Sequence, residues 1–133
     1  MKATDLAIYK VMRRINNTML AHTKNVSKEV KYAEWLDARR LAQEAEDLVF
    51  AVNMEEDANL SFRMCRTLEL KMYGVKHRVR RLSECGYLPV GYKTRLIIDV
   101  DDCIKQAHDW GNYFKRKART DASRQFGSAS YMD

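Results

Sequence analysis

Glycine, proline and cysteine are scarce in this chain. Its 133 residues include five Gly, one Pro and three Cys. An all-β domain needs turns at intervals of about 8–12 residues, and Gly and Pro make most such turns. The three cysteines, Cys65, Cys85 and Cys103, have no C-x-x-C spacing. This pattern argues against a disulfide framework and a zinc ribbon, and free thiols suit a reducing cytoplasm.

Long apolar runs and recognisable catalytic motifs are also missing. No stretch approaches the roughly 18 uncharged apolar residues of a membrane span, and MKATDLAIYKVMRR lacks the apolar core of a signal peptide. The sequence contains no Walker loop, G-x-G-x-x-G or G-x-S-x-G, and His22, His77 and His108 are scattered. We therefore predict a cytoplasmic protein that is not an enzyme, uses no cofactor or metal, and does not enter a membrane.

Apolar residues recur every three or four positions along most of the chain, the spacing of amphipathic helices. This pattern predicts helices over residues 4–22, 29–52, 56–85 and 90–119, with Thr4 and Ser27 as N-caps and Gly86 and Pro89 as a stop signal. Four such helices with short connections predict an all-α, antiparallel up-down-up-down four-helix bundle over residues 1–119. Residues 120–133 are small, polar and aperiodic and predict a tail that is disordered alone or ordered by a partner.

Positive charge is concentrated on the third predicted helix. The net charge is +6 and the pI is about 9.3, which favours a polyanionic partner. At 100° per residue, Met72, Val75 and Val79 share one face, and most of the cations lie opposite. The candidate nucleic-acid-binding residues on this helix are Arg63, Arg66, Tyr73, Lys76, His77, Arg80 and Arg81.

Two further basic clusters complete the predicted site: Lys115, Arg116, Lys117 and Arg119 on the last helix, and Arg13 and Arg14 on the first. Lys and Arg would release counterions from phosphates, and Tyr73 and Tyr113 could stack on bases. Charge reversal at Arg63, Arg66 and Arg81 is the natural test. Two other interpretations stay open: the cations simply solvate a helix face, or they meet an acidic surface such as residues 44–57 of another subunit.

One stretch, LIIDVDDC, has the apolar-flanked carboxylates of a polymerase palm. Its helical pattern and the short chain argue against that interpretation. We expect Asp99, Asp101 and Asp102 to be solvated and to pair with Arg95 and Lys105 along the same helix.

Several segments together resemble a known family. They are IYKVMRRI, DARRLAQEAEDLVFAVN, RLSECGYLP and QAHDWGNYFKR, with a Gly-Tyr-Leu-Pro turn at 86–89 and Trp110 late in the last helix. Over about residues 4–119 the chain resembles a bacterial and phage four-helix-bundle family. That family includes the accessory variability determinant (Avd) of diversity-generating retroelements and proteins encoded in intervening sequences of large-subunit ribosomal RNA genes.

The resemblance implies a ring-like homo-oligomer, a homopentamer, with a basic surface. For Avd it implies binding to the retroelement's reverse transcriptase and to nucleic acid, RNA or DNA, in support of mutagenic cDNA synthesis. For the intervening-sequence proteins it implies only general RNA binding or an unknown role. No family motif assigns individual binding residues.

Overall fold

A computed structural model describes the backbone of residues 2–132 and the side chains of residues 2–29 and 33–124. Within this part of the chain the regular structure is all helical, with no strand. The helices are α1 (Ala7–His22), α2 (Lys28–Val30), α3 (Leu36–Met54), α4 (Ala58–Glu84) and α5 (Val90–Met132). A π-helical turn, Lys31–Trp35, joins the short α2 to α3. The predicted all-α class is therefore confirmed.

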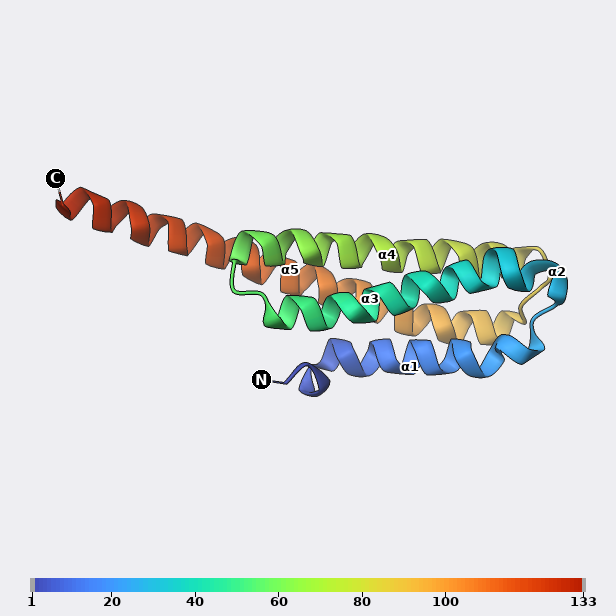
Figure 1. Cartoon of the computed structure of the whole chain (residues 1–133). Coiled ribbons are helices and arrows are strands. Elements are labelled where there is room, and N and C mark those ends of the chain that lie inside the picture. Colours follow the sequence, from blue (N-terminus) through green and yellow to red (C-terminus); the bar gives the residue numbers. More distant parts are fainter. Residues whose placement is uncertain (1, 133) are drawn as a thin grey trace.

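The four long helices lie side by side, and each runs opposite to the one before it (Figure 1). Helices α1 and α4 lie at opposite edges of the bundle, and each packs on both α3 and α5. This arrangement agrees with the predicted four-helix bundle. Because α4 touches its neighbours along only part of its circumference, one full side of this helix faces away from the bundle.

The core is made from the apolar stripes that the sequence predicts. On α4, Leu68, Met72, Val75 and Val79 are completely buried, as are the small residues Ala38, Ala42 and Ala45 on α3. Small residues let helix axes approach closely. A Cβ built on Gly74 would lie only 3.0 Å from Leu41 Cδ1, so α3 and α4 are close together here. Helix α4 continues through Gly74 without a break, as predicted.

The helix ends agree with the sequence in some places and differ in others. The Ser27 hydroxyl accepts a hydrogen bond from the Glu29 backbone N–H at 3.3 Å, as expected of a cap. Thr4, however, is not the cap of α1. It lies in a separate 3-10 turn, Ala3–Asp5, and Leu6 precedes the helix with extended backbone. The Leu6 side chain packs against the core, which favours this break in the helix.

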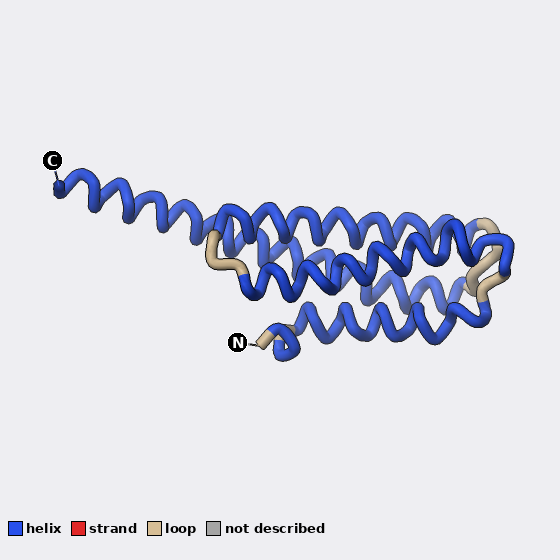
Figure 2. Tube along the Cα trace, viewed as in Figure 1, coloured by secondary structure: helices blue, strands red, loops and turns tan. Residues whose placement is uncertain are grey.

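Helix α5 is longer than the sequence pattern predicts. The apolar stripe ends near Arg119, yet the helical backbone continues to Met132. Residues 120–132 contain no proline, and extending an existing helix is far easier than starting one. Figure 2 shows α5 projecting past the ends of the other helices as a single rod. The side chains of residues 125–133, in the predicted tail, lie outside the described residues.

Gly86 ends α4 in the way that its sequence context predicts. Its φ angle is +83°, the left-handed conformation that glycine adopts most readily. Two backbone bonds close the end: Tyr87 N–H donates to the Leu82 carbonyl at 2.8 Å, and Gly86 N–H donates to Ser83 at 3.0 Å. This is the Schellman arrangement of a helix C-terminus.

We expect Gly86→Ala to lower the free energy of unfolding by about 1–2 kcal/mol, because a Cβ disfavours the left-handed conformation. Nothing lies within 4 Å of the position that the new Cβ would take, so the cost should come from the backbone alone. Urea denaturation followed by circular dichroism measures the change. Gly91→Ala is the matched control, since its Cβ position is equally open and the residue is helical. Equal stability of both variants would contradict this account.

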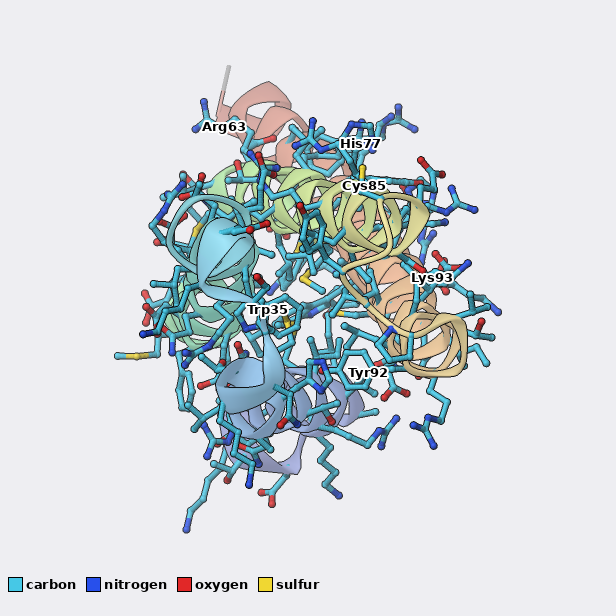
Figure 3. The ribbon with its side chains drawn as sticks, turned by 90° about the vertical axis from the view of Figure 1, so that its right-hand side faces the viewer. Trp35, Arg63, His77, Cys85, Tyr92 and Lys93 are labelled. Atoms are coloured by element: carbon cyan, nitrogen blue, oxygen red, sulfur yellow. The ribbon has the colours of Figure 1, made fainter. Side chains whose placement is uncertain are left out.

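An aromatic cluster closes the end of the bundle that carries the α4–α5 turn. The His22 ring stacks on Tyr92 with centroids 4.0 Å apart, and the buried Trp35 packs edge-on against His22. Trp35 Nε1 donates a hydrogen bond to Thr23 Oγ1 at 3.0 Å. Burial lowers the pKa of His22 and raises the pKa of Tyr92 to about 12. These residues have partners within the fold and serve the structure (Figure 3).

Candidate nucleic-acid interface

The outer side of α4 carries the cations that the sequence predicts there. Arg63, Arg66, Tyr73, His77, Arg80 and Arg81 are all exposed, and Lys76 is half-buried. Their exposure follows from the helical period, since the buried residues of α4 occupy the opposite side. Figure 3 shows Arg63 and His77 together on this outer side, pointing away from the bundle.

Three of the predicted cations on α4 are already paired with carboxylates. Arg66 Nη1 lies 2.9 Å from Glu69 Oε2, one turn along the same helix. Lys76 Nζ lies 2.6 Å from Asp101 Oδ1 on α5, and Arg81 Nη2 lies 2.9 Å from Glu34 Oε2. The last two pairs link α4 to its neighbours, and all three neutralise part of the predicted charge.

Other cations of α4 have no such partner. Arg63, His77 and Arg80 form no ion pair with any residue that the structure describes, and all three are exposed. Arg78, by contrast, is half-buried and donates to the Gly74 carbonyl of its own helix at 3.2 Å. The free positive charge of this side therefore comes from Arg63 and Arg80, and the exposed His77 lies between them in the helix.

The first-helix cluster does not join this surface. Arg13 and Arg14 lie on α1, at the opposite edge of the bundle from α4. Arg13 pairs with Glu46 at 3.3 Å. Arg14 makes two hydrogen bonds to the Asp99 carboxylate, at 3.0 and 2.8 Å, which raise its pKa. Helix packing therefore separates these two arginines from the candidate surface on α4.

The last-helix cluster does extend the surface of α4. Lys115 Nζ lies 5.7 Å from the centre of the Phe62 ring, near the start of α4. Beyond this contact Arg116, Lys117, Arg119 and Arg124 are exposed on the projecting part of α5, and the structure describes no ion pair for them. Figure 3 places this part of α5 on the same side of the molecule as Arg63 and His77. We refer to Arg63, His77, Arg80, Arg116, Lys117, Arg119 and Arg124 as the cationic track.

A groove of about 620 Å³ runs beside this track, between α4 and α5. Its walls include Tyr73, Leu70 and Lys105. Glu69 is also part of the groove although it is almost fully buried, and its carboxylate accepts hydrogen bonds from Arg66 at 2.9 Å and His108 Nδ1 at 3.0 Å. Sequence reasoning missed the roles of Glu69, Lys105 and His108, because only packing brings the two helices together.

The acidic stretch does not form a separate opposing patch. Glu44 accepts from Lys71 at 2.7 Å and from Arg40 at 3.1 Å, and the hydrogen bond from Lys71 lowers the pKa of Glu44. Asp57 caps α4, accepting from the backbone N–H of Asn59 at 2.9 Å. Several carboxylates of residues 44–57 thus serve local structure, although Asp47 and Glu56 remain exposed.

The carboxylates of LIIDVDDC pair across helices. The sequence suggested partners within the same helix, but Asp99 binds Arg14 of α1 and Asp101 binds Lys76 of α4. Only Asp102 keeps an intrahelical partner, Gln106, at 3.2 Å. Within the described residues, His, Cys, Asp and Glu side chains do not gather in groups of three or more that could hold a metal ion.

The fold and the charged surface together define a class: a small all-helical bundle with a cationic side. Comparisons with protein-family models, with curated proteins and with solved structures find no match to this chain. The resemblance to the Avd and intervening-sequence family therefore stays a prediction from the sequence. In the described part of the chain, none of the helices combines the length and the apolarity needed to cross a membrane.

Proposed function

We propose that this chain is a non-catalytic basic scaffold that binds nucleic acid along the cationic track. The observation that carries the proposal is the set of exposed cations that have no ion-pair partner in the described part of the chain, from Arg80 on the outer side of α4 to Arg124 on the projecting part of α5. At 1.5 Å per residue, the α4 part spans about 25 Å and the α5 part, from Arg116 to Arg124, spans about 12 Å. A phosphate backbone of similar length would release counterions on binding.

A more specific form of the proposal comes from the resemblance. It is that the protein acts as an Avd-type accessory factor that binds a retroelement reverse transcriptase and its RNA, as a ring-like homopentamer in the cytoplasm. The intervening-sequence alternative keeps RNA binding without the polymerase. Co-purification with the reverse transcriptase of the same retroelement distinguishes the two, because only the first requires a stable complex.

A salt titration tests nucleic-acid binding itself. The affinity for a labelled RNA oligonucleotide, measured by fluorescence anisotropy, should fall linearly in a log–log plot against salt concentration. Each phosphate contact to a single strand contributes about 0.7 to the slope. With several track cations engaged, we expect a slope of roughly −3 to −5. Absence of RNA binding at low salt would overturn the proposal and favour the third interpretation, a homo-oligomer whose basic side meets an acidic protein.

A further inference from the structure

Two exposed tyrosines lie among the cations of the track. Tyr73 and Tyr113 are each 51% exposed, more than the exposed aromatic side chains of Phe50 and Tyr87. Tyr73 lines the α4–α5 groove with Arg66 and Lys76, and it also lines a smaller hollow with His77 and Arg80. Tyr113 lines a separate hollow of about 330 Å³ with Arg116, Lys117 and Arg124. Each aromatic ring thus has positive charge around it.

The fold makes little use of these two rings. Among the tyrosines whose side chains the structure describes, Tyr9 packs edge-on against Phe50, Tyr87 donates to Glu29, and Tyr92 donates to the Thr18 carbonyl. Tyr73 has no hydrogen bond and no ring contact within the described residues. Tyr113 packs edge-to-face with Phe114, with ring centroids 5.1 Å apart. Exposing an aromatic ring to water costs free energy, yet at both positions the ring is exposed.

The two rings lie at different heights along the bundle. A Cβ on Gly111 would be 3.2 Å from Cys65 Cβ, so these two residues lie at the same height in the bundle. Tyr113 is two residues beyond Gly111 on α5, and Tyr73 is eight residues from Cys65 in the other direction. At 1.5 Å per residue, the two tyrosines are about 15 Å apart along the bundle axis. Gly111 and Lys115 face α4. Tyr113 lies two residues from each, so its ring points away from α4 and would meet a different part of a bound strand from Tyr73.

We infer that the track binds single-stranded nucleic acid, with Tyr73 and Tyr113 stacking on unpaired bases while the neighbouring cations hold the phosphates. This inference rests on the proposed function and adds that the bound nucleic acid is single-stranded. A duplex hides the faces of its bases, so it would use the cations alone and leave both rings exposed. A single strand presents phosphates and base faces together, and base–aromatic stacking does not depend on base identity. The carboxylates of the groove do not oppose this, since Glu69 and Asp101 are already paired with Arg66 and Lys76.

The test compares a labelled single-stranded RNA with a hairpin duplex of the same number of phosphates, using fluorescence anisotropy on the full chain. Tyr73→Ala and Tyr113→Ala should each weaken binding of the single strand about 5- to 150-fold, with duplex affinity within about twofold of the unmodified protein. Tyr73→Phe and Tyr113→Phe keep the ring and should retain the affinity. Tyr87→Ala, a partly exposed tyrosine at the far end of α4, is the matched control and should change neither.

The possible failures are distinguishable. Unchanged affinity of the alanine variants for the single strand, or an equal loss for both nucleic acids, would overturn the stacking role and leave the proposed function standing. Failure of the unmodified protein to bind either nucleic acid would overturn the proposed function and this inference with it. Circular dichroism of each variant checks that its helix content is unchanged.

Discussion

Replacing Arg63, Arg80 and Arg119 together by Gln is expected to weaken RNA binding roughly 100-fold at about 0.1 M salt, because each lost phosphate contact removes about 0.7 of a log unit there. The slope of the salt titration should become shallower by about 2 for the same reason. All three side chains are exposed and have no ion-pair partner in the described part of the chain. Helix content and oligomer size should therefore stay as they are, which circular dichroism and light scattering can check.

The control is a triple variant with the same change in net charge at paired arginines. Arg13, Arg14 and Arg40 bind Glu46, Asp99 and Glu44, so their replacement by Gln should change RNA affinity far less, well under tenfold. An equal loss in both triple variants would mean that net charge alone, and no particular surface, attracts the nucleic acid. The trio that sequence reasoning selects is less suitable, because Arg66 and Arg81 are paired with Glu69 and Glu34.

Val79→Asp should lower the free energy of unfolding by about 4 kcal/mol or more, a large fraction of the roughly 5–15 kcal/mol that native proteins have. Val79 is completely buried in α4's apolar stripe, near the C-terminal end of the helix. The substitution removes its packing and places a carboxylate where the surrounding core offers no charged partner. Urea denaturation followed by circular dichroism measures the loss, and a variant that does not fold at all would agree with the upper end of the range.

Arg80→Asp is the control for this substitution. It places the same carboxylate one residue further along the helix, on the exposed side, where surface substitutions change stability by about 0.5 kcal/mol or less. A Val79→Asp variant as stable as Arg80→Asp would show that the buried side of α4 has been assigned incorrectly. The comparison tests the orientation of the helix on which the cationic track depends.

The helices and their buried sides could be predicted because both follow from local spacing. Ile8, Val11, Ile15 and Met19 recur at helical intervals and are buried on α1, and the cations of α4 fall opposite its apolar stripe. The cap at Ser27 and the helix end at Gly86 could likewise be predicted, because each depends only on residues close to it in the sequence. The predicted cap at Thr4 was wrong, since the packing of Leu6 against the core breaks the helix just before Ala7.

The distribution of free charge could not be predicted in the same way. Arg14 and Asp99 are 85 residues apart in sequence and meet only because α1 packs against α5. Lys76 and Asp101, and Arg81 and Glu34, meet for the same kind of reason. The groove with its buried Glu69 also combines residues of α4 and α5. Pairing of this sort leaves no periodic signal in the sequence.

By itself, then, the sequence determined an all-helical chain and the outward orientation of the cations on α4, because the helical period places residues on one side or the other whatever the helix packs against. The tertiary structure alone decided which cations remain unpaired, that Arg13 and Arg14 lie away from them, and that α5 carries the positive charge beyond the bundle. The physical reason is that an ion pair depends on distances of a few ångströms between atoms of different helices, and only packing sets those distances.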